Sequence, residues 1–328
     1  MGKEILIIMI MKKIKDLNVG DYVDGFTSVI TSIDVKKGKT GKFILLTLSD
    51  DSGNIDAVKW NFEEEPPKLY DTCVLGGEVQ ISNFTKKKQL VIHDLSWKTD
   101  LEVARKFMKH SVIAPNELYD KMESLLNEII DVDLKDFCLK VHHKFEKEIK
   151  EVPAAVINHH DYYGGYAQHV FEVMSLSVAT TKILSELSNY DYSMDLIIAG
   201  SYLHDLGKLK SYFLDGLEPS MTFEGKLNDH IGEGVLLLTQ LAQELGSSTF
   251  NSKWLSYLTN VILTHHENLE WGSPIKPSYP EALIIARSDN MSASNEEMIK
   301  GIDEIGELEL FENTKSYLFG TRLHRKKI

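Results

Sequence analysis

The stretch Ser201–Lys210, SYLHDLGKLK, decides how the larger part of this chain folds. It continues the apolar run MDLIIAG (194–200), and together they predict a buried helix. His204 and Asp205 interrupt its apolar face, and burying such groups is unfavourable unless a partner compensates them. A metal ion is one such partner and a local hydrogen-bond network is another. This stretch alone leaves both open.

The sequence around this stretch is predicted to be helical from about residue 101 onward. Apolar residues recur at three- and four-residue spacing, as they do on the buried face of a helix. The segments with this pattern are 116–130, 133–149, 165–188, 192–210, 228–245, 251–266 and 280–291. No strand pattern of comparable strength appears here. We therefore predict a linker helix over 101–118 and an all-α bundle over 119–328.

The N-terminal part carries the pattern of short β-strands. Runs rich in β-branched and aromatic residues, bounded by Gly, Asp and Asn, lie at 21–34, 42–48, 55–60, 72–81 and 89–95. Gly25, Gly76 and Gly77 fall inside these runs and predict bulges or bends. Five strands in about 80 residues fit a small closed barrel, of which the OB-fold is the best-known case. We assign residues 1–100 to this barrel, with 1–11 as an N-terminal extension of a chain that could equally start at Met11.

Two predicted hairpin loops of the barrel are basic. The lysines are Lys36, Lys37, Lys39 and Lys42 between the first two strands, and Lys86, Lys87 and Lys88 between the last two. OB barrels bind oligonucleotides with these loops, and Phe43, Trp60 and Phe84 could offer stacking faces to bases. The alternative is that both lysine clusters are solvated turns.

Composition limits the class of protein. The 328 residues, 43% of them hydrophobic and 26% charged, are typical of a globular protein of two domains. The apolar run ILIIMIM (5–11) is too short to span a bilayer, and no small-residue cleavage site follows it. Only Cys73 and Cys138 are present, which excludes a disulfide framework and a thiolate metal site and favours a cytoplasmic setting. The net charge of −13 argues against a protein coated in nucleic acid.

Histidines are concentrated in the helical part. Nine of the twelve lie between residues 142 and 266. Five of these histidines and two aspartates lie on or beside predicted apolar helices, where a polar side chain needs a partner. They are His169, His204, Asp205, His230, His265, His266 and Asp289. Helical bundles build metal sites from such inward-pointing side chains. Imidazole and carboxylate without thiolate favour Mn²⁺, Fe, Co²⁺, Ni²⁺ or Zn²⁺ over Ca²⁺.

This order of residues resembles the HD-domain superfamily of metal-dependent phosphohydrolases, which is named after its adjacent His-Asp pair. Two further blocks, PAAVINHHDYYGGYAQH (153–169) and THHENLEWGSP (264–274), resemble those of the YhaM-type 3′-to-5′ exoribonucleases. That family also has an N-terminal OB domain, so the resemblance covers about residues 12–315. The chain departs from its pattern at Glu267, where Gly is expected, and at Tyr166–Gln168, where a Leu-Leu-Glu type of triplet is more usual.

The resemblance implies a dinuclear site. It assigns His169, His204, Asp205 and Asp289 to one metal, and a bridging Asp205 joins His230, His265 and His266 at the second. His266 could instead contact substrate or orient a ligand. Mn²⁺ is the metal we expect most.

Other polar residues near these blocks have two readings each. Lys208 lies three residues after Asp205, so a continuing helix would place it on the same face, where it could neutralise the scissile phosphate; the alternative is a solvated lysine. His160 is our candidate for a substrate phosphate contact, with a helix-entry role as the alternative. Glu267 and Glu270 could orient ligand imidazoles. We expect His142 and His143 to lie on an exposed helix face.

The expected function is therefore that of a metal-dependent 3′-to-5′ exonuclease acting on single-stranded RNA, with DNA as a further substrate. One alternative is an HD phosphohydrolase of nucleotides or cyclic nucleotides with a regulatory OB module. Another is a non-enzymatic single-strand-binding protein. We expect no membrane partner, and the sequence leaves a homo-oligomer open.

Overall fold

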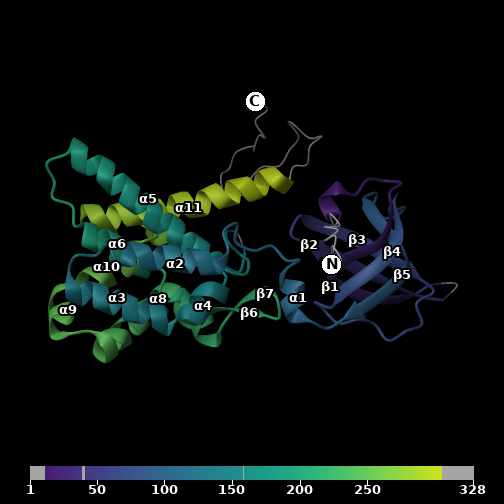
Figure 1. Cartoon of the computed structure of the whole chain (residues 1–328), viewed down its shortest axis with the longest axis horizontal. Helices are drawn as coiled ribbons and strands as arrows, with labels where there is room; N and C mark the ends of the chain where they lie inside the picture. Colours follow the sequence, from purple (N-terminus) through teal and green to yellow (C-terminus); the bar gives the residue numbers. More distant parts are fainter. Residues whose placement is uncertain (1–11, 39–40, 158, 305–328) are drawn as a thin grey trace, which may run out of the picture. The chain divides into compact units, whose positions relative to one another are not determined.

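A closed barrel of five strands forms the core of the N-terminal unit (Figure 1). The computed structural model describes residues 12–38, 41–157 and 159–304, and the chain divides into two units between His110 and Ser111. The strands are β1 (Tyr22–Lys37), β2 (Lys42–Asp50), β3 (Gly53–Trp60), β4 (Thr72–Ile81) and β5 (Lys88–Lys98), preceded by the 3₁₀ helix η1 (Ile14–Asp16). Their order around the barrel is β1-β2-β3-β5-β4, with β3 and β5 parallel. The predicted OB-type barrel is confirmed, while the predicted extension over 1–11 and Lys39 lie outside the described residues.

Alternation along the strands fills the barrel. In β2, Ile44, Leu46 and Leu48 point inward and are buried, as expected for a strand with one face on a core. The predicted bulges are present, because the β1–β4 register shifts between Val23 and Phe26, around Gly25, and the β4–β5 register shifts between Gly76 and Gly77. These bends let five strands close on themselves.

The second unit is helical. After α1 (Leu101–Arg105), which belongs to the first unit, the helices are α2 (Pro115–Leu126), α3 (Val132–Lys144), α4 (Glu146–Glu151), α5 (Gly165–Leu187), α6 (Met194–Leu203), α7 (Lys208–Ser211), α8 (Phe223–Leu245), α9 (Ser248–Lys253), α10 (Leu255–Thr264), η2 (Leu269–Trp271) and α11 (Pro280–Glu304). No helix in the described part of the chain is long and apolar enough to cross a membrane.

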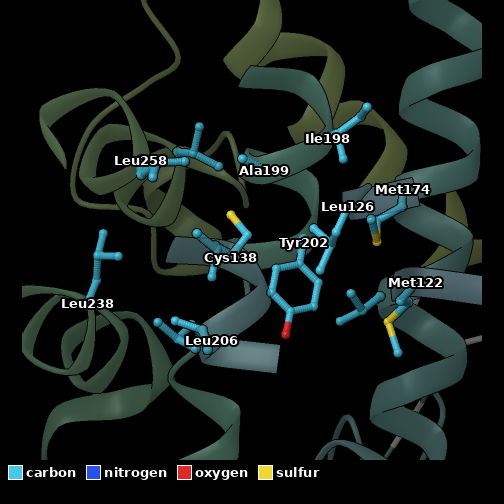
Figure 2. Packing of buried hydrophobic residues seen from close by; sticks show 14 of the residues in the cluster. Met122, Leu126, Cys138, Met174, Ile198, Ala199, Tyr202, Leu206, Leu238 and Leu258 are labelled. Carbon is cyan, nitrogen blue, oxygen red and sulfur yellow. The ribbon is translucent and has the colours of Figure 1, made fainter. Parts of the chain in front are cut away.

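The helical unit is organised around α6. Every residue from Leu196 to Leu203 is buried, and its apolar side chains contact a core drawn from α2, α3, α5, α8 and α10 (Figure 2). Tyr202 lies in the middle of that core, beside Leu126 and Cys138. A helix buried on all sides is held rigidly, so the turn that follows it is a well-fixed place for functional groups.

Three local predictions differ from the structure. The span assigned to the linker helix is helical only in α1 and in the first turn of α2, and the chain between them is irregular. α2 begins at Pro115, where the missing N–H of proline is tolerated, in agreement with the helical pattern predicted from 116. A two-stranded hairpin, β6 (Tyr212–Asp215) and β7 (Glu218–Met221), interrupts the helical region, and its Asp215–Gly216 pair is a hairpin signal that we overlooked. His142, predicted to be exposed, is fully buried, whereas its neighbour His143 is exposed.

Candidate metal centre

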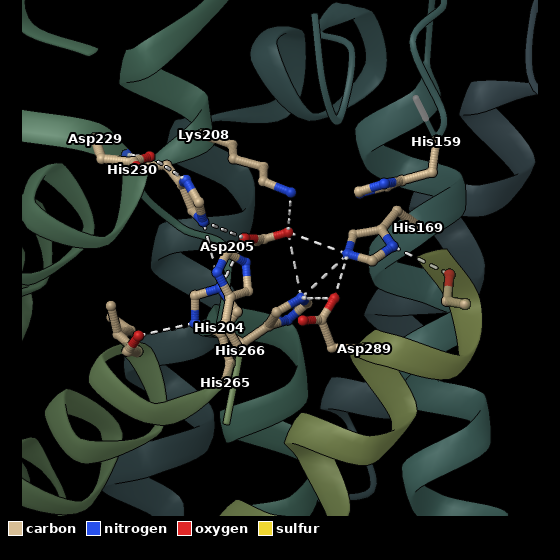
Figure 3. Close-up of polar contacts among 12 residues, drawn as sticks. His159, His169, His204, Asp205, Lys208, Asp229, His230, His265, His266 and Asp289 are labelled. Atoms are coloured by element: carbon tan, nitrogen blue, oxygen red, sulfur yellow. Dashed lines mark hydrogen bonds and ion pairs between the residues drawn. The ribbon is translucent and has the colours of Figure 1, made fainter. Parts of the chain in front are cut away.

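Five helices of the second unit bring seven polar side chains to one buried place (Figure 3). They are His169 on α5, His204 and Asp205 just after α6, His230 on α8, His265 and His266 just after α10, and Asp289 on α11. Six of the seven are buried and His266 is half-buried. Their ligand atoms form two groups, each within 4.8 Å: one of His169, His204, Asp205 and Asp289, the other of His230, His265 and His266. The structure thus brings together all the side chains that the resemblance assigned to metal binding.

The helix predicted over 192–210 is broken at the His-Asp pair. α6 ends at Leu203, and the chain turns through His204–Gly207 before α7 begins at Lys208. A Cβ atom on Gly207 would overlap the carbonyl oxygen of His230 and the amide nitrogen of Gly234 in α8. Only glycine therefore allows the turn to approach α8 this closely. This approach places His230 opposite Asp205.

Backbone carbonyls orient three of the imidazoles. The Nδ1–H groups of His204, His265 and His266 donate to the carbonyl oxygens of Ser201 (2.7 Å), Ile262 (2.8 Å) and Trp271 (2.7 Å), respectively. A carbonyl only accepts, so Nδ1 carries the proton in each ring. The lone pair of Nε2 is left free and points into the centre.

Side chains orient the other two imidazoles. Nδ1 of His230 lies 2.5 Å from Oδ1 of Asp229, and this contact is the main cause that lowers the pKa of Asp229 to about 2. Nδ1 of His169 lies 3.1 Å from Oγ of Ser292, whose hydroxyl donates to Glu172. Both rings therefore also present Nε2 to the centre. Partners of this kind commonly fix the orientation of metal-binding histidines.

Asp205 lies between the two groups. Its Oδ2 is 3.1 Å from Nε2 of His169 and 3.3 Å from Nε2 of His204. Its Oδ1 is 3.5 Å from Nε2 of His265 and 3.6 Å from Nε2 of His230. Each oxygen of one carboxylate thus faces a different group, which is the geometry of a bridging ligand.

The arrangement fits cations better than any set of hydrogen bonds. Nε2 of His230 faces Nε2 of His265 at 3.4 Å, although neither nitrogen carries a proton. Oδ1 of Asp205 is buried without a hydrogen bond from any described residue, and only Oδ2 has a cation beside it, the ammonium group of Lys208. Facing lone pairs and buried unsatisfied oxygens are unfavourable unless a positive charge lies between them.

Electrostatics point the same way. Burial lowers the pKa of His265 well below its usual range, which keeps the ring neutral as a ligand must be. Burial also disfavours a charge on His169, yet contacts with Asp205 and Asp289 raise its pKa to about 9. Burial opposes ionisation of Asp205 too, but Lys208 and the neighbouring histidines hold its pKa well below the usual range. The centre therefore attracts positive charge, and the donor set is one that binds divalent metals.

Lys208 lies beside the bridging carboxylate. Its Nζ is 2.7 Å from Oδ2 of Asp205, and its side chain is buried. Burial disfavours the ammonium form, but the Asp205 carboxylate raises the pKa of Lys208, so the charge is retained. Lys208 thus lies next to Asp205, as we expected, but the turn after α6 brings them together and not a continuous helix.

Comparison with known proteins agrees with this geometry. Residues 166–294 match the HD domain family, a span that contains all seven side chains of the centre. Relatives named 3′-5′ exoribonuclease YhaM are similar over most of the chain. The protein from Listeria monocytogenes serotype 4b (strain CLIP80459) is 30% identical over 289 residues, covering 86% of this chain and 88% of the relative. The protein from Bacillus subtilis (strain 168) is 29% identical over 291 residues, covering 88% and 90%.

The chain belongs to the YhaM family of 3′-5′ exoribonucleases. It is accordingly a hydrolase, and its HD domain together with the two groups of ligand atoms supports binding of divalent metal. The seven side chains of the centre are referred to below as the HD centre.

The YhaM block around residue 160 is arranged differently from our expectation. His160 is fully buried, and its Nε2 lies 3.3 Å from Oε2 of Glu172. His159 points toward the HD centre from the side opposite Asp205, with its ring centroid 5.6 Å from that of His169 (Figure 3). His159 is thus the better placed of the two histidines for a substrate contact.

The barrel of this YhaM-family chain carries its basic loops as exposed groups. Lys36, Lys37, Lys42, Lys86, Lys87 and Lys88 are all exposed. Two of them have partners on the barrel, since Lys36 pairs with Asp34 at 3.0 Å and Nζ of Lys88 donates to the carbonyl oxygen of Leu17. The rings of Phe43 and Trp60 lie 4.8 Å apart on paired positions of β2 and β3, and Trp60 is half-exposed.

The sequence did not reveal which groups orient the histidines. Glu267, which we considered for this role, pairs instead with Arg287. Backbone carbonyls orient three of the five imidazoles. Carbonyls carry no sequence signature. Asp229 could have been recognised from its place next to His230, whereas Glu172 and Ser292 are 120 residues apart and meet only in the fold.

Proposed function

We propose that this chain is a metal-dependent 3′-to-5′ exonuclease that hydrolyses the phosphodiester bonds of single-stranded RNA at a dinuclear HD centre. The observation that carries the proposal is the division of the Asp205 carboxylate between the two ligand groups. Phosphodiester anions repel nucleophiles, and cations held by the two ligand groups would offset that negative charge. The exoribonuclease relatives supply the substrate class and the direction.

The proposed ligands are those of the two groups. His169, His204, Asp205 and Asp289 hold one ion, and His230, His265 and His266 hold the other together with Asp205. Two such ions, Mn²⁺ being our first choice for this nitrogen and oxygen donor set, would supply an activated water and stabilise the negative charge of the phosphate. The contacts of the imidazoles with backbone carbonyls, Asp229 and Ser292 hold the rings so that each Nε2 stays directed inward.

Two side chains are assigned to the substrate. Lys208 keeps its charge beside Asp205 and is placed to bind a phosphate oxygen next to the bridging carboxylate. On the opposite side, His159 takes the phosphate contact that we first assigned to His160. Lys208 would supply the positive charge and the hydrogen-bond donor, and the ring of His159 would contact the phosphate from the other side.

The barrel is assigned to the single strand upstream of the cleaved end. Phe43 and Trp60 offer an aromatic surface near the loop with Lys36, Lys37 and Lys42, and Lys86–Lys88 lie at the other end of the β3–β5 pair. Stacking on aromatic faces and contact between lysines and phosphates are the sequence-tolerant means of binding a strand. The two free, buried cysteines support action in the reducing cytoplasm.

The test is degradation of a 5′-labelled single-stranded RNA in Mn²⁺ by the wild-type chain and by Asp205→Ala. We expect a ladder of products that shorten from the 3′ end, and none with the variant. An intact RNA together with hydrolysis of a small or cyclic nucleotide would replace the proposal with the phosphohydrolase alternative. Equal cleavage by Asp205→Ala would trace the activity to a contaminant. A matched DNA strand in the same assay decides whether DNA is also a substrate.

A further inference from the structure

A chain of hydrogen bonds leaves the HD centre through His169 and ends on Glu172. Nδ1–H of His169 faces Oγ of Ser292 at 3.1 Å, and the Ser292 hydroxyl donates to Oε2 of Glu172 at 2.7 Å. Ser292 is buried, and its one hydroxyl proton is given to the carboxylate, so its oxygen must accept from His169. The negative charge of Glu172 thereby sets the direction of both hydrogen bonds, from His169 to Ser292 and from Ser292 to Glu172.

The same carboxylate holds the loop that carries His159. Oε2 of Glu172 lies 3.3 Å from Nε2 of His160, which is fully buried and has a positive backbone φ of 50°. That conformation is uncommon for histidine and persists where surrounding contacts hold it. Next to it, Nδ1 of His159 lies 3.5 Å from Oε1 of Glu297. The loop therefore contacts α5 through His160 and α11 through His159.

Glu172 is itself held in place from a third direction. Its Oε1 accepts from Nε2 of Gln168 at 3.0 Å, and Oε1 of Gln168 accepts from the backbone amide of Val112 at 2.8 Å. Burial opposes ionisation of the half-buried carboxyl, but the contact with His160 and the hydrogen bonds from Ser292 and Gln168 lower the pKa of Glu172 to about 2. It is a fixed carboxylate outside the HD centre, with contacts leading to both sides of it.

We propose that Glu172 is a positioning residue that fixes the ring of His169 through Ser292 and the His159 loop through His160. The inference rests on the proposed metal site. A carboxylate that accepts from Ser292 keeps the proton of His169 on Nδ1 and makes Nε2 a better donor to a cation. Outer partners of this kind commonly change metal affinity by about 10- to 100-fold when removed. The second ligand group lies outside the hydrogen-bond series His169–Ser292–Glu172. We therefore expect the affinity for an ion held by His230, His265 and His266 to change little.

The experiment measures Mn²⁺ binding by calorimetry, without RNA, for wild type, Glu172→Gln, Ser292→Ala and the double variant. The matched control is Glu186→Gln, an exposed glutamate on the same helix. We expect Glu172→Gln and Ser292→Ala each to weaken the binding of one of two Mn²⁺ ions by about 10-fold or more. The affinity for the other ion should stay within about twofold of wild type. The double variant should be no worse than the weaker single variant, because both act through one relay.

A second measurement follows His169 directly. Nitrogen-proton NMR of the metal-free imidazoles, recorded above pH 9 where the ring of His169 is neutral, distinguishes the Nδ1–H form from the Nε2–H form, and thermal unfolding of each variant at that pH checks that it is folded. We expect the Nδ1–H signal of His169 to be reduced in folded Glu172→Gln and unchanged in Glu186→Gln.

The outcomes separate this inference from the proposed function. Folded variants with both Mn²⁺ affinities and the His169 signal unchanged would overturn the role of Glu172 and leave the metal site intact. Wild-type protein that binds no Mn²⁺ would overturn both. Normal Mn²⁺ binding with no cleavage of RNA would remove the exonuclease proposal but not the relay.

Discussion

Oε1 of Glu267 lies 2.7 Å from Nη2 of Arg287, and it reaches there from a residue with a backbone φ of 62°. This is the position at which the family pattern led us to expect glycine. A left-handed conformation is unfavourable for a residue with a Cβ atom, by about 1 kcal/mol or more, and free of that strain for glycine. The ion pair with Arg287 offsets part of this cost, since the Glu267 side chain is largely buried while Arg287 is exposed.

The first prediction compares Glu267→Gly with Glu267→Ala. Both variants lose the Arg287 contact, but only glycine relieves the backbone. We expect Glu267→Gly to be more stable than Glu267→Ala by about 1 kcal/mol, the reverse of the usual order in a helix. Urea unfolding measures the difference, and the same pair of substitutions at the exposed Glu186, inside α5, should favour alanine. If Glu267→Ala is more stable than Glu267→Gly, the loop relaxes out of the left-handed conformation without cost.

The second prediction concerns Lys208, which is buried 2.7 Å from Asp205. Replacing it with methionine keeps much of the side-chain volume and removes the charge meant for the phosphate. We expect kcat for RNA hydrolysis to fall by about 100- to 1000-fold, as when a preorganised donor to a transition state is removed. Mn²⁺ affinity should not weaken, because Asp205 loses a competing cation. Lys210→Met on the exposed side of the same helix is the control, and a loss of kcat explained entirely by loss of Mn²⁺ would contradict the assignment.

How much could be predicted from the sequence varies with the kind of signal. The barrel followed from strand periodicity and glycine positions, and the ligand set followed from polar residues in apolar helices. The break after α6 was missed because an apolar run continues through Leu206 and Leu209, and periodicity does not show a turn in which glycine allows close packing. His142 was placed on the wrong face because the lysines around it suggested solvent. The partners of the histidines depend on long-range contacts that no local pattern encodes.

The third prediction uses His142. Its ring stacks on Tyr119 with centroids 3.8 Å apart, and its Nδ1 lies 3.2 Å from the hydroxyl of Tyr202. Burial lowers its pKa from 6.5 to about 4. The folded chain therefore binds fewer protons here than the unfolded chain, so the free energy of unfolding falls as pH drops below 6.5 and levels off below about 4.

For this one group we expect a loss of about 1.3 kcal/mol between pH 7.5 and 5.5. Urea unfolding measures the free energy of unfolding of wild type and of His142→Leu at both pH values. Relative to His142→Leu, wild type should lose that amount at the lower pH. The control is Cys138→Ala, which removes another buried side chain of α3 but no histidine, so its difference in stability from wild type should be the same at both pH values. A constant gap between wild type and His142→Leu would mean that His142 is not held neutral.

The last prediction separates strand binding by the barrel from catalysis. In an Asp205→Ala background that leaves RNA intact, Trp60→Ala should weaken binding of a single strand by about 1–3 kcal/mol, since one stacking surface is lost. The control is Val74→Ala, a residue of β4 that is 43% exposed, against 50% for Trp60, but offers no aromatic face. Replacing Lys86, Lys87 and Lys88 with glutamine should lower the salt dependence instead, with the slope of log K against log salt reduced by about 0.7 for each phosphate contact removed. If Trp60→Ala and the lysine variant both bind like Val74→Ala, the strand is held elsewhere, and the barrel of this enzyme serves another purpose.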